Sequence, residues 1–393
     1  MINVKDALNI VTKSLIHTEI HTINLTENKT EKLSDYFLAE NIYSPIDMPP
    51  FSQSAMDGYA ICGDFDNYKV VGEVKAGDVH NLSINNGEAY RIFTGGMVPD
   101  GTTAIAKQEI VNRQDDIITL TENVKQGTSI RVQGEELING DLVISKGTKL
   151  TPAAIGLICG LGIAQIKVRK KPNVALIVTG NELTRVGNPL ERGKIYESNS
   201  YTIKSALLEN GIICDLHFVK DNFEDTKSTI DNAIKNNDLV IMTGGISVGD
   251  YDFVGKALLD LGVEQKFYKV KQKPGKPLFY GEINQTKVFG LPGNPAAALT
   301  SFYVYILTAI KTMMGANEPQ LLKIKAKMAH DFTKKGDRAH FLKAQIQGNS
   351  VKVHSGQSSA MLSSFADANC LLFLDETDHQ ILKGQEVDVL MLP

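Results

Sequence analysis

The sequence predicts a multidomain chain in which a central doubly wound α/β domain is flanked by regions of short β-strands. From residue 173 to about 315, short apolar runs alternate with amphipathic helical stretches, as in parallel sheets covered by helices on both faces. From about 59 to 150, and again after 318, short alternating runs are separated by Gly, Asn and Asp turns, which indicates small β modules. With 393 residues and 42% hydrophobic residues, the chain can form several ordinary cores.

Turn signals and composition divide the chain into four expected domains. A mixed N-terminal domain is expected to be discontinuous and to take residues 1–58 and 138–170. A small β module, 59–137, is inserted into it. The α/β domain is expected at 171–317 and a C-terminal β-barrel at 318–393.

Charge and cysteine content indicate the kind of partner and the compartment. The formal net charge is −4, and lysines are scattered among acids, so no basic surface for nucleic acid is expected. Cys62, Cys159, Cys214 and Cys370 lie far apart without metal-type spacing. We therefore expect reduced, buried thiols in a cytoplasmic protein, and the amphipathic N-terminus lacks the apolar core of a signal peptide.

One apolar stretch, residues 296–314, is long enough to raise the question of a membrane span. It starts after Asn294-Pro295, ends at Gly315 and contains Lys311. These are the boundaries of a helix with a charged residue inside it, so a buried helix and no membrane association are expected.

The segment DLVIMTGGISVGDYD, residues 238–252, predicts an anion-binding loop. Its apolar run suits a strand buried on both faces. The glycines after it allow backbone N–H groups to approach an oxyanion at the start of the next helix. The alternative is a tight turn whose glycines serve packing alone. The candidate binding residues are Thr243, Gly244, Gly245, Ser247, Gly249 and Asp250.

Other predicted strands of the α/β domain also end in polar or glycine-rich segments. Parallel sheets bind ligands at the carboxyl ends of their strands, so these segments should share one edge. They contribute Thr179, Gly180, Glu182, Asp221, Pro292, Gly293, Asn294 and Pro295. Carboxylates beside glycine loops suit a Mg²⁺-assisted phosphate site, with Glu182, Asp221, Asp250 and Asp252 as candidates. Each acid could instead cap a helix.

Three further segments carry candidate site residues. In YKVKQKPGKPLFYG, the turn Pro274-Gly275 concentrates cationic donors for an oxyanion, although Lys271 or Lys276 should be ordinary solvated surface. The lysines are Lys269, Lys271, Lys273 and Lys276. SAMDGYA places Asp57 in an ordered turn, and TGGMVPDGTTAIAKQE offers Thr94 and Gly95 to line a pocket.

Seven segments in order, PPFSQSAMDGYA, TGGMVPDGTTAIAKQE, TGNEL, YESNSY, TGGISVGDYD, KPGKP and LPGNP, resemble the signatures of the molybdopterin molybdenumtransferase family. This is the molybdenum insertase family of the bacterial MoeA proteins and the gephyrin E domain. The resemblance covers essentially the whole chain, including GQSSAMLSSFADANC. It implies a molybdopterin-binding, MogA-like α/β domain.

The resemblance also implies an activity. Such proteins take molybdate and adenylylated molybdopterin, cleave the adenylate with Mg²⁺, and release AMP. They are homodimers whose cleft lies between the α/β domain of one subunit and the N-terminal β module of the other. The adenylylating enzyme and acceptor molybdoenzymes are expected as further partners.

Motif matching transfers the functional residues of the family to this chain. The catalytic acids fall on Asp57, Glu182, Asp221 and Asp252, of which the last three would hold Mg²⁺. The catalytic lysines fall on Lys269 and Lys273. Additional substrate-binding residues fall on Ser198, Asn199, Pro274, Gly275, Lys276, Pro292, Pro295 and Ser359.

Some positions depart from the family pattern, and two other functions are alternatives. Asn181 replaces a common Asp, Glu136 stands where Asp is common, and Lys343 replaces a frequent Arg and loses its planar bidentate donors. One alternative is a molybdopterin adenylyltransferase, which would resemble only the middle domain. The other is a dimeric scaffold with a peptide-binding groove, which has no need of the acidic set.

Overall fold

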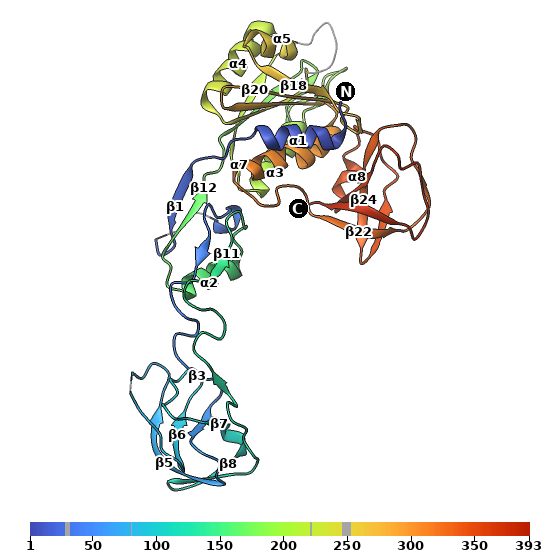
Figure 1. Cartoon of the computed structure of the whole chain (residues 1–393). Helices are drawn as coiled ribbons and strands as arrows, with labels where there is room; N and C mark the ends of the chain where they lie inside the picture. Colours follow the sequence, from blue (N-terminus) through green and yellow to red (C-terminus); the bar gives the residue numbers. More distant parts are fainter. Residues whose placement is uncertain (28–31, 80, 221, 246–252) are drawn as a thin grey trace. The chain divides into compact units, whose positions relative to one another are not determined.

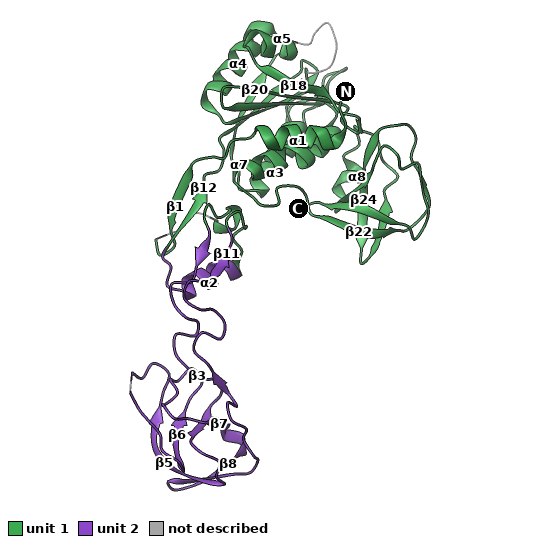
Figure 2. Ribbon diagram, in the orientation of Figure 1, with its two compact units in different colours: residues 1–40, 146–152, 165–393 green, residues 41–145, 153–164 purple. Residues whose placement is uncertain are grey.

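The computed structural model describes the chain except for residues 28–31, 80, 221 and 246–252. The described residues form two compact units (Figure 2). Unit 1 comprises 1–40, 146–152 and 165–393; unit 2 comprises 41–145 and 153–164. The four finer domain limits expected above stay predictions.

The sheet of the α/β domain in unit 1 confirms the predicted doubly wound fold (Figure 1). Its strand order is β16-β13-β17-β21-β20-β18. The bounds are β13 Val174–Thr179, β16 Cys214–Val219, β17 Leu239–Thr243, β18 Glu264–Lys269, β20 Pro277–Ile283 and β21 Thr286–Leu291. The strands β16, β13, β17 and β21 run parallel, whereas β20 is antiparallel to both of its neighbours. Every residue of β13 and β17 is buried, because helices cover both faces.

Two helix layers cover this sheet (Figure 1). On one face, α4 packs against α5; on the other lie α3 and the long C-terminal helix of the domain. The bounds are α3 Asn199–Glu209, α4 Phe223–Asn236 and α5 Phe253–Asp260. The side chain of Asn222 caps α4 by accepting hydrogen bonds from the N–H groups of Glu224 and Asp225.

The long helix consists of α6 Pro295–Ser301, a π-helical segment Phe302–Ile306, and α7 Leu307–Met313. Among the described residues, Pro295–Met313 is the one helix long and apolar enough to cross a membrane by length and composition. However, 83% of its most apolar 18-residue window is buried within the protein, which confirms the prediction of a buried helix.

The N-terminal part of unit 1 packs against the same domain. Helix α1, Val4–Ser14, begins at Asn3, whose side chain accepts a hydrogen bond from the N–H of Asp6 at 2.7 Å. After α1, β1 Ile20–Asn24 pairs antiparallel with β12 Gln165–Arg169. Short elements of unit 1 are η1 Leu33–Asp35 and the parallel pair β14 Leu183–Thr184 and β15 Ile195–Tyr196.

The C-terminal strands of unit 1 confirm the predicted β-barrel. The order β24-β25-β22-β28-β26 closes because β24 also pairs with β26. The bounds are β22 Lys323–Met328, β24 Ala339–Gln347, β25 Ser350–Val353, β26 Cys370–Leu374 and β28 Glu386–Met391. Strand β19, Gln272–Lys273, extends this sheet by pairing with β24. Beside them lie β23 Phe332–Thr333, paired with β27 Gln380–Ile381, and α8 Ser363–Ala366.

Unit 2 is built around the strand order β7-β4-β6-β5-β9-β8. These strands are β4 Gly58–Ile61, β5 Asn67–Val74, β6 Glu88–Ile92, β7 Ala104–Lys107, β8 Val111–Gln114 and β9 Ile117–Leu120. Two short antiparallel pairs accompany them: β2 Ile42–Tyr43 with β11 Leu142–Ile144, and β3 Gln53–Ser54 with β10 Ile130–Arg131. The helical elements are η2 Gln108–Ile110 and α2 Pro152–Gly160, whose first residue belongs to unit 1.

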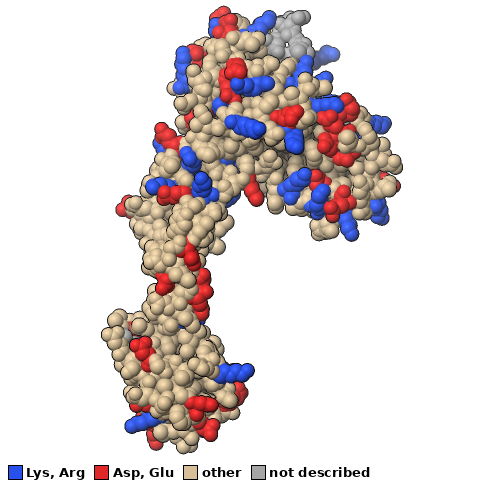
Figure 3. All heavy atoms as spheres, viewed as in Figure 1, with Lys and Arg blue, Asp and Glu red and all other residues tan. Residues whose placement is uncertain are grey.

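The expectation of four buried thiols is wrong in part. All four cysteines are free, and Cys62 and Cys370 are buried, but Cys214 is half-buried and Cys159 is exposed. Cys159 lies on α2, which is apolar all round, so its sequence pattern could not show which face is buried. Basic and acidic side chains are interspersed over the face drawn in Figure 3.

Candidate functional site

A cavity of about 390 Å³ lies at the carboxyl ends of β13, β17 and β21. The structure thus brings together residues from four separate segments that the sequence analysis selected. Of the predicted residues, Thr179, Glu182, Asn199, Thr243, Gly244, Gly245, Pro292, Gly293 and Asn294 line it. Leu183, Ile195 and Pro277 also line it and were not predicted.

Glycines are needed where the loops of this cavity meet. At Gly244, φ is +85° and a Cβ would lie 2.4 Å from the carbonyl oxygen of Thr179. At Gly180, a Cβ would lie 2.7 Å from a carboxylate oxygen of Glu182. The first glycine therefore lets the loop after β17 touch the end of β13, and the second leaves room for the Glu182 carboxylate.

Three polar atoms of residues that line the cavity are buried without a hydrogen-bond partner among the described residues. They are Thr179 Oγ1, Thr243 Oγ1 and Asn199 Oδ1. The amide nitrogen of Asn199 donates to the carbonyl of Gly293 at 2.8 Å, so its oxygen has a fixed direction. Buried polar atoms normally have partners, because leaving one unpaired costs about 1–3 kcal/mol. A polar ligand bound in the cavity would recover this cost.

The start of α3 is fixed by a buried carboxylate that sequence reasoning missed. Glu197 is 3% exposed and accepts hydrogen bonds from the N–H of Ser200, at 2.7 Å, and from its hydroxyl. The predicted Ser198 is the N-cap residue but makes no side-chain capping bond, and it does not line the cavity. The Glu-x-x-Ser spacing was the available signal.

The four candidate lysines separate into different environments. Lys271 pairs with Glu376 at 2.8 Å and with Asp337 at 3.4 Å, so it is a structural residue. Lys273 and Lys276 are exposed and have no ion pair among the described residues. Lys269 lies over the ring of Tyr268, with 5.0 Å from Nζ to the ring centroid. The Pro274-Gly275 turn itself is buried.

Ser359 lies against the loop that starts the long helix. Its hydroxyl accepts a hydrogen bond from Asn294 at 3.1 Å, and its carbonyl accepts one from the N–H of Ala297 at 3.1 Å. The buried Lys343 donates to the carbonyls of Ser358 and Met361 at 3.1 and 2.9 Å. Burial lowers the pKa of Lys343, which here holds the backbone around Ser359 in place.

Pro274, Gly275 and Ser359 do not line the cavity, but Gly275 and Ser359 lie against α6, whose first residue is the predicted Pro295. A Cβ on Gly275 would lie 3.6 Å from the carbonyl oxygen of Ala297. We call residues 273–276, with Pro274-Gly275 at the centre, the lysine turn. The lysine turn and the loop that carries Ser359 therefore both contact the same turn of α6, next to the cavity.

Asp57, Thr94 and Gly95 lie together in unit 2. A carboxylate oxygen of Asp57 accepts hydrogen bonds from the backbone N–H and the hydroxyl of Thr94, both at 2.8 Å. These two bonds lower the pKa of Asp57, so it is ionised at neutral pH. Gly95 has φ of +80° and donates its N–H to Ser54 at 2.8 Å.

The predicted residues Asp221, Ser247, Gly249, Asp250 and Asp252 lie outside the described residues. Within the described ranges, no group of three or more His, Cys, Asp or Glu side chains could hold a metal. The cavity nevertheless offers only hard oxygen donors, with the Glu182 carboxylate and the unpaired oxygens of Thr179, Thr243 and Asn199. This donor set fits Mg²⁺ rather than a soft metal.

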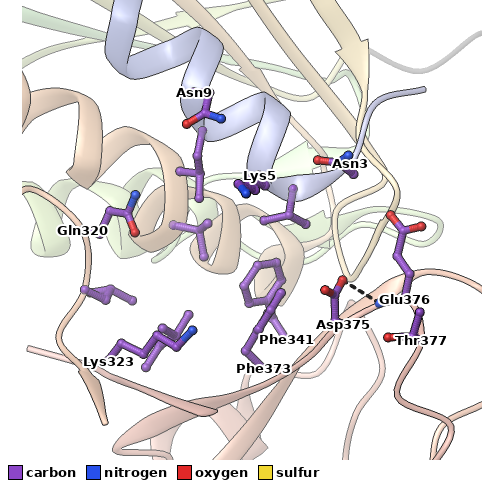
Figure 4. A pocket seen from close by; sticks show the side chains of 15 residues that line it. Asn3, Lys5, Asn9, Gln320, Lys323, Phe341, Phe373, Asp375, Glu376 and Thr377 are labelled. Atoms are coloured by element: carbon purple, nitrogen blue, oxygen red, sulfur yellow. Dashed lines mark hydrogen bonds between the residues drawn. The ribbon is translucent and has the colours of Figure 1, made fainter.

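A larger cavity, of about 540 Å³, shares no lining residue with the first one (Figure 4). Side chains of α1, including Leu8, form one wall, and Phe341 and Phe373 from the barrel form another. The two rings are 5.2 Å apart. Its polar residues, such as Asn3 and Gln320, lie around an apolar centre.

Comparison with known proteins agrees with this architecture. The MoeA N-terminal region (domain I and II) matches residues 2–162, the probable molybdopterin binding domain matches 175–312, and the MoeA C-terminal region (domain IV) matches 325–392. A molybdopterin molybdenumtransferase of Staphylococcus epidermidis is 32% identical, over 99% of this chain and 95% of that protein. The chain belongs to the molybdopterin molybdenumtransferase family.

Further members of the molybdopterin molybdenumtransferase family show the same full-length agreement. The protein of that name from Haemophilus influenzae is 34% identical, over 95% of this chain and 94% of its own length. The structure of a molybdopterin biosynthesis MoeA protein from Pyrococcus horikoshii OT3 covers 100% of both chains, with a TM-score of 0.86 and 28% identity.

Proposed function

We propose that this chain, a transferase of molybdenum cofactor biosynthesis, transfers molybdenum from molybdate to adenylylated molybdopterin and releases AMP. The cavity of about 390 Å³ at the carboxyl ends of β13, β17 and β21, called here the strand-end cavity, supports this proposal most directly. It combines a glycine-lined loop, a carboxylate and three polar atoms without a described partner. Family membership over the whole length supports the same reaction.

Each described residue then has a role that follows from its environment. The hydroxyls of Thr179 and Thr243 donate to substrate oxygens, because neither has another partner among the described residues. Lys273 and Lys276 attract the oxyanion, since no described acid neutralises them. Ser359 offers its hydroxyl to the substrate, and Asn294 fixes the orientation of that hydroxyl.

Glu182, together with Asp221 and Asp252, would hold Mg²⁺ at this edge of the sheet. When bound, the ion neutralises phosphate charge and polarises the scissile phosphoanhydride. Glu182 is the described member of this set, and the missing Cβ of Gly180 leaves its carboxylate free to face the cavity.

We further propose that the protein is a cytoplasmic homodimer in which Asp57 of one subunit serves the cavity of the other. Mixing Asp57→Ala chains with Asp252→Ala chains should then restore part of the activity, because heterodimers would contain one intact site. Absence of any recovery would place Asp57 and the cavity in the same chain. The adenylylating enzyme and acceptor molybdoenzymes are the proposed partners.

The deciding experiment is AMP release from adenylylated molybdopterin, measured with and without molybdate and Mg²⁺. We expect release only when both are present. Formation of adenylylated molybdopterin from ATP would instead support the adenylyltransferase alternative. No turnover of either kind would leave the scaffold alternative.

A further inference from the structure

The lysine turn is held from inside the protein by one buried amide. Gln272 is 0% exposed, and its side-chain nitrogen donates to the carbonyls of Pro274 and Gly275 at 3.1 and 3.2 Å. These carbonyls belong to the two buried residues between Lys273 and Lys276. The amide therefore fixes the backbone conformation from which both lysine side chains extend.

The orientation of that amide is set by Tyr305, in the π-helical segment of the long helix. Its hydroxyl donates to the side-chain oxygen of Gln272 at 2.5 Å. Tyr305 is also 0% exposed, and burial raises its pKa, so it stays a neutral donor. With this bond, the amide oxygen and both amide hydrogens of Gln272 have partners.

The turn has little freedom to shift against the long helix. Gly275 has φ of +83°, and a Cβ there would lie 2.8 Å from Ser301 Oγ and 3.0 Å from the Gln272 amide nitrogen. In contrast, the ammonium groups of Lys273 and Lys276 are exposed and lack ion pairs among the described residues. The position of these flexible cations is thus defined mainly by their backbone.

We infer that Gln272 and Tyr305 are positioning residues that fix the turn presenting Lys273 and Lys276 to the oxyanion substrate. This inference rests on the proposed function, in which that oxyanion is molybdate. Neither residue touches the substrate. Their effect should therefore appear as weaker use of molybdate, with the chemistry at saturation preserved.

The test measures AMP release against molybdate concentration for Tyr305→Phe and Gln272→Met. We expect the KM for molybdate to rise about threefold and about tenfold, respectively, because the first variant leaves the amide oxygen unpaired and the second removes both donors to the turn. The kcat should stay within about twofold of wild type, and half-saturation by adenylylated molybdopterin should not change.

Tyr280→Phe is the matched control for the loss of a buried tyrosine hydroxyl. Tyr280 is 0% exposed and its hydroxyl bonds Ser14 at 2.6 Å and Glu282 at 3.2 Å, away from the turn carbonyls. We expect this variant to lower the melting temperature while the KM for molybdate stays at the wild-type value. An equal rise in KM for both tyrosine variants would overturn the inference, because it would reflect general loosening.

A combined variant keeps the test decisive if single variants are less stable. If Tyr305 acts through the two lysines of the turn, adding Tyr305→Phe to Lys273→Gln/Lys276→Gln should leave the KM for molybdate unchanged. If the increases in KM caused by the tyrosine and lysine substitutions multiply, the inference is overturned.

A wild-type chain without molybdate-dependent AMP release would overturn the proposed function instead. The inference would then be tested by equilibrium dialysis with molybdate alone, which measures the affinity of each protein for molybdate. Equal affinities of wild type and Tyr305→Phe would overturn the inference.

Discussion

Two cavities of unit 1 differ in size and in chemistry, and the smaller of these two has the features of a reaction site. The cavity between α1 and the barrel measures about 540 Å³ and centres on apolar side chains such as Phe341 and Phe373. The strand-end cavity measures about 390 Å³, yet polar atoms of Thr179, Thr243 and Asn199 are buried there without described partners. No described residue that lines the larger cavity has such an atom, so unpaired buried polarity separates these two cavities better than volume does.

The largest expected effect is that of Glu182→Gln, which tests whether charge distinguishes the strand-end cavity. The amide keeps the shape of the carboxylate but cannot neutralise a cation, so AMP release should fall about 100-fold or more at saturating substrates. The measurement is single-turnover AMP release. Glu191→Gln, an exposed acid paired with Lys194, is the control and should retain full activity. Loss of less than threefold in Glu182→Gln would remove its metal role.

Gly244→Ala tests whether the contact between the two strand ends shapes this cavity. The added Cβ meets the Thr179 carbonyl at 2.4 Å in a left-handed backbone, so the free energy of unfolding should drop by about 2–4 kcal/mol. Urea denaturation measures this loss.

Gly262→Ala is its control, with φ of +80° and no atom within 4 Å of the added Cβ. It should cost only about 1 kcal/mol, because conformational strain remains but the clash is absent. Equal losses for both variants would show that backbone strain, and not the contact, accounts for the effect.

Thr243→Val tests whether the buried hydroxyl of Thr243 serves ligand binding and not the stability of the fold. Removing a buried hydroxyl without a described partner should leave the free energy of unfolding unchanged or raise it by about 1 kcal/mol. Binding of adenylylated molybdopterin, measured by calorimetry, should weaken about tenfold because a donor is lost.

Thr286→Val is the matched control, because its buried hydroxyl donates to Ile234 and Asn237, both at 2.9 Å. It should lower the free energy of unfolding by about 1–2 kcal/mol and leave binding intact. If Thr243→Val destabilises as much as Thr286→Val, its hydroxyl has a structural partner.

The smallest effect on activity is expected in the larger cavity. Leu8 is half-buried on α1 and lines that cavity, so Leu8→Ser makes the wall polar without touching the strand ends. AMP release should stay within about twofold of wild type. A fall of tenfold or more, with an unchanged melting temperature, would show that both cavities serve the reaction.

Much of the fold was predictable because its signals are local. The buried run Leu239–Thr243 and the Asn294-Pro295 helix start are encoded by neighbouring residues, and the structure shows a strand and a helix there. The rule that parallel strand ends share one edge then brings Thr179, Thr243 and Gly293 to one cavity. The catalytic and metal-binding roles stay predictions.

Features that depend on contacts between residues far apart in the sequence were not predictable. Nothing near Gln272 shows that Tyr305 fixes its amide, because a π-helical segment sets the direction of the tyrosine. The sequence identified Lys343 only as a departure from a frequent arginine, whereas the structure shows its amine on two backbone carbonyls. Cys159 was misjudged because an apolar helix gives no burial pattern.

The order of synthesis imposes a delay on unit 1. Ser14 bonds Tyr280, and α1 packs against α7, so this N-terminal helix lacks its partners until residues up to about 313 have been made. Unit 2 lies entirely within residues 41–164 and can fold while translation continues. Newly made α1 therefore exposes its apolar face on the ribosome longer than any strand of unit 2 does.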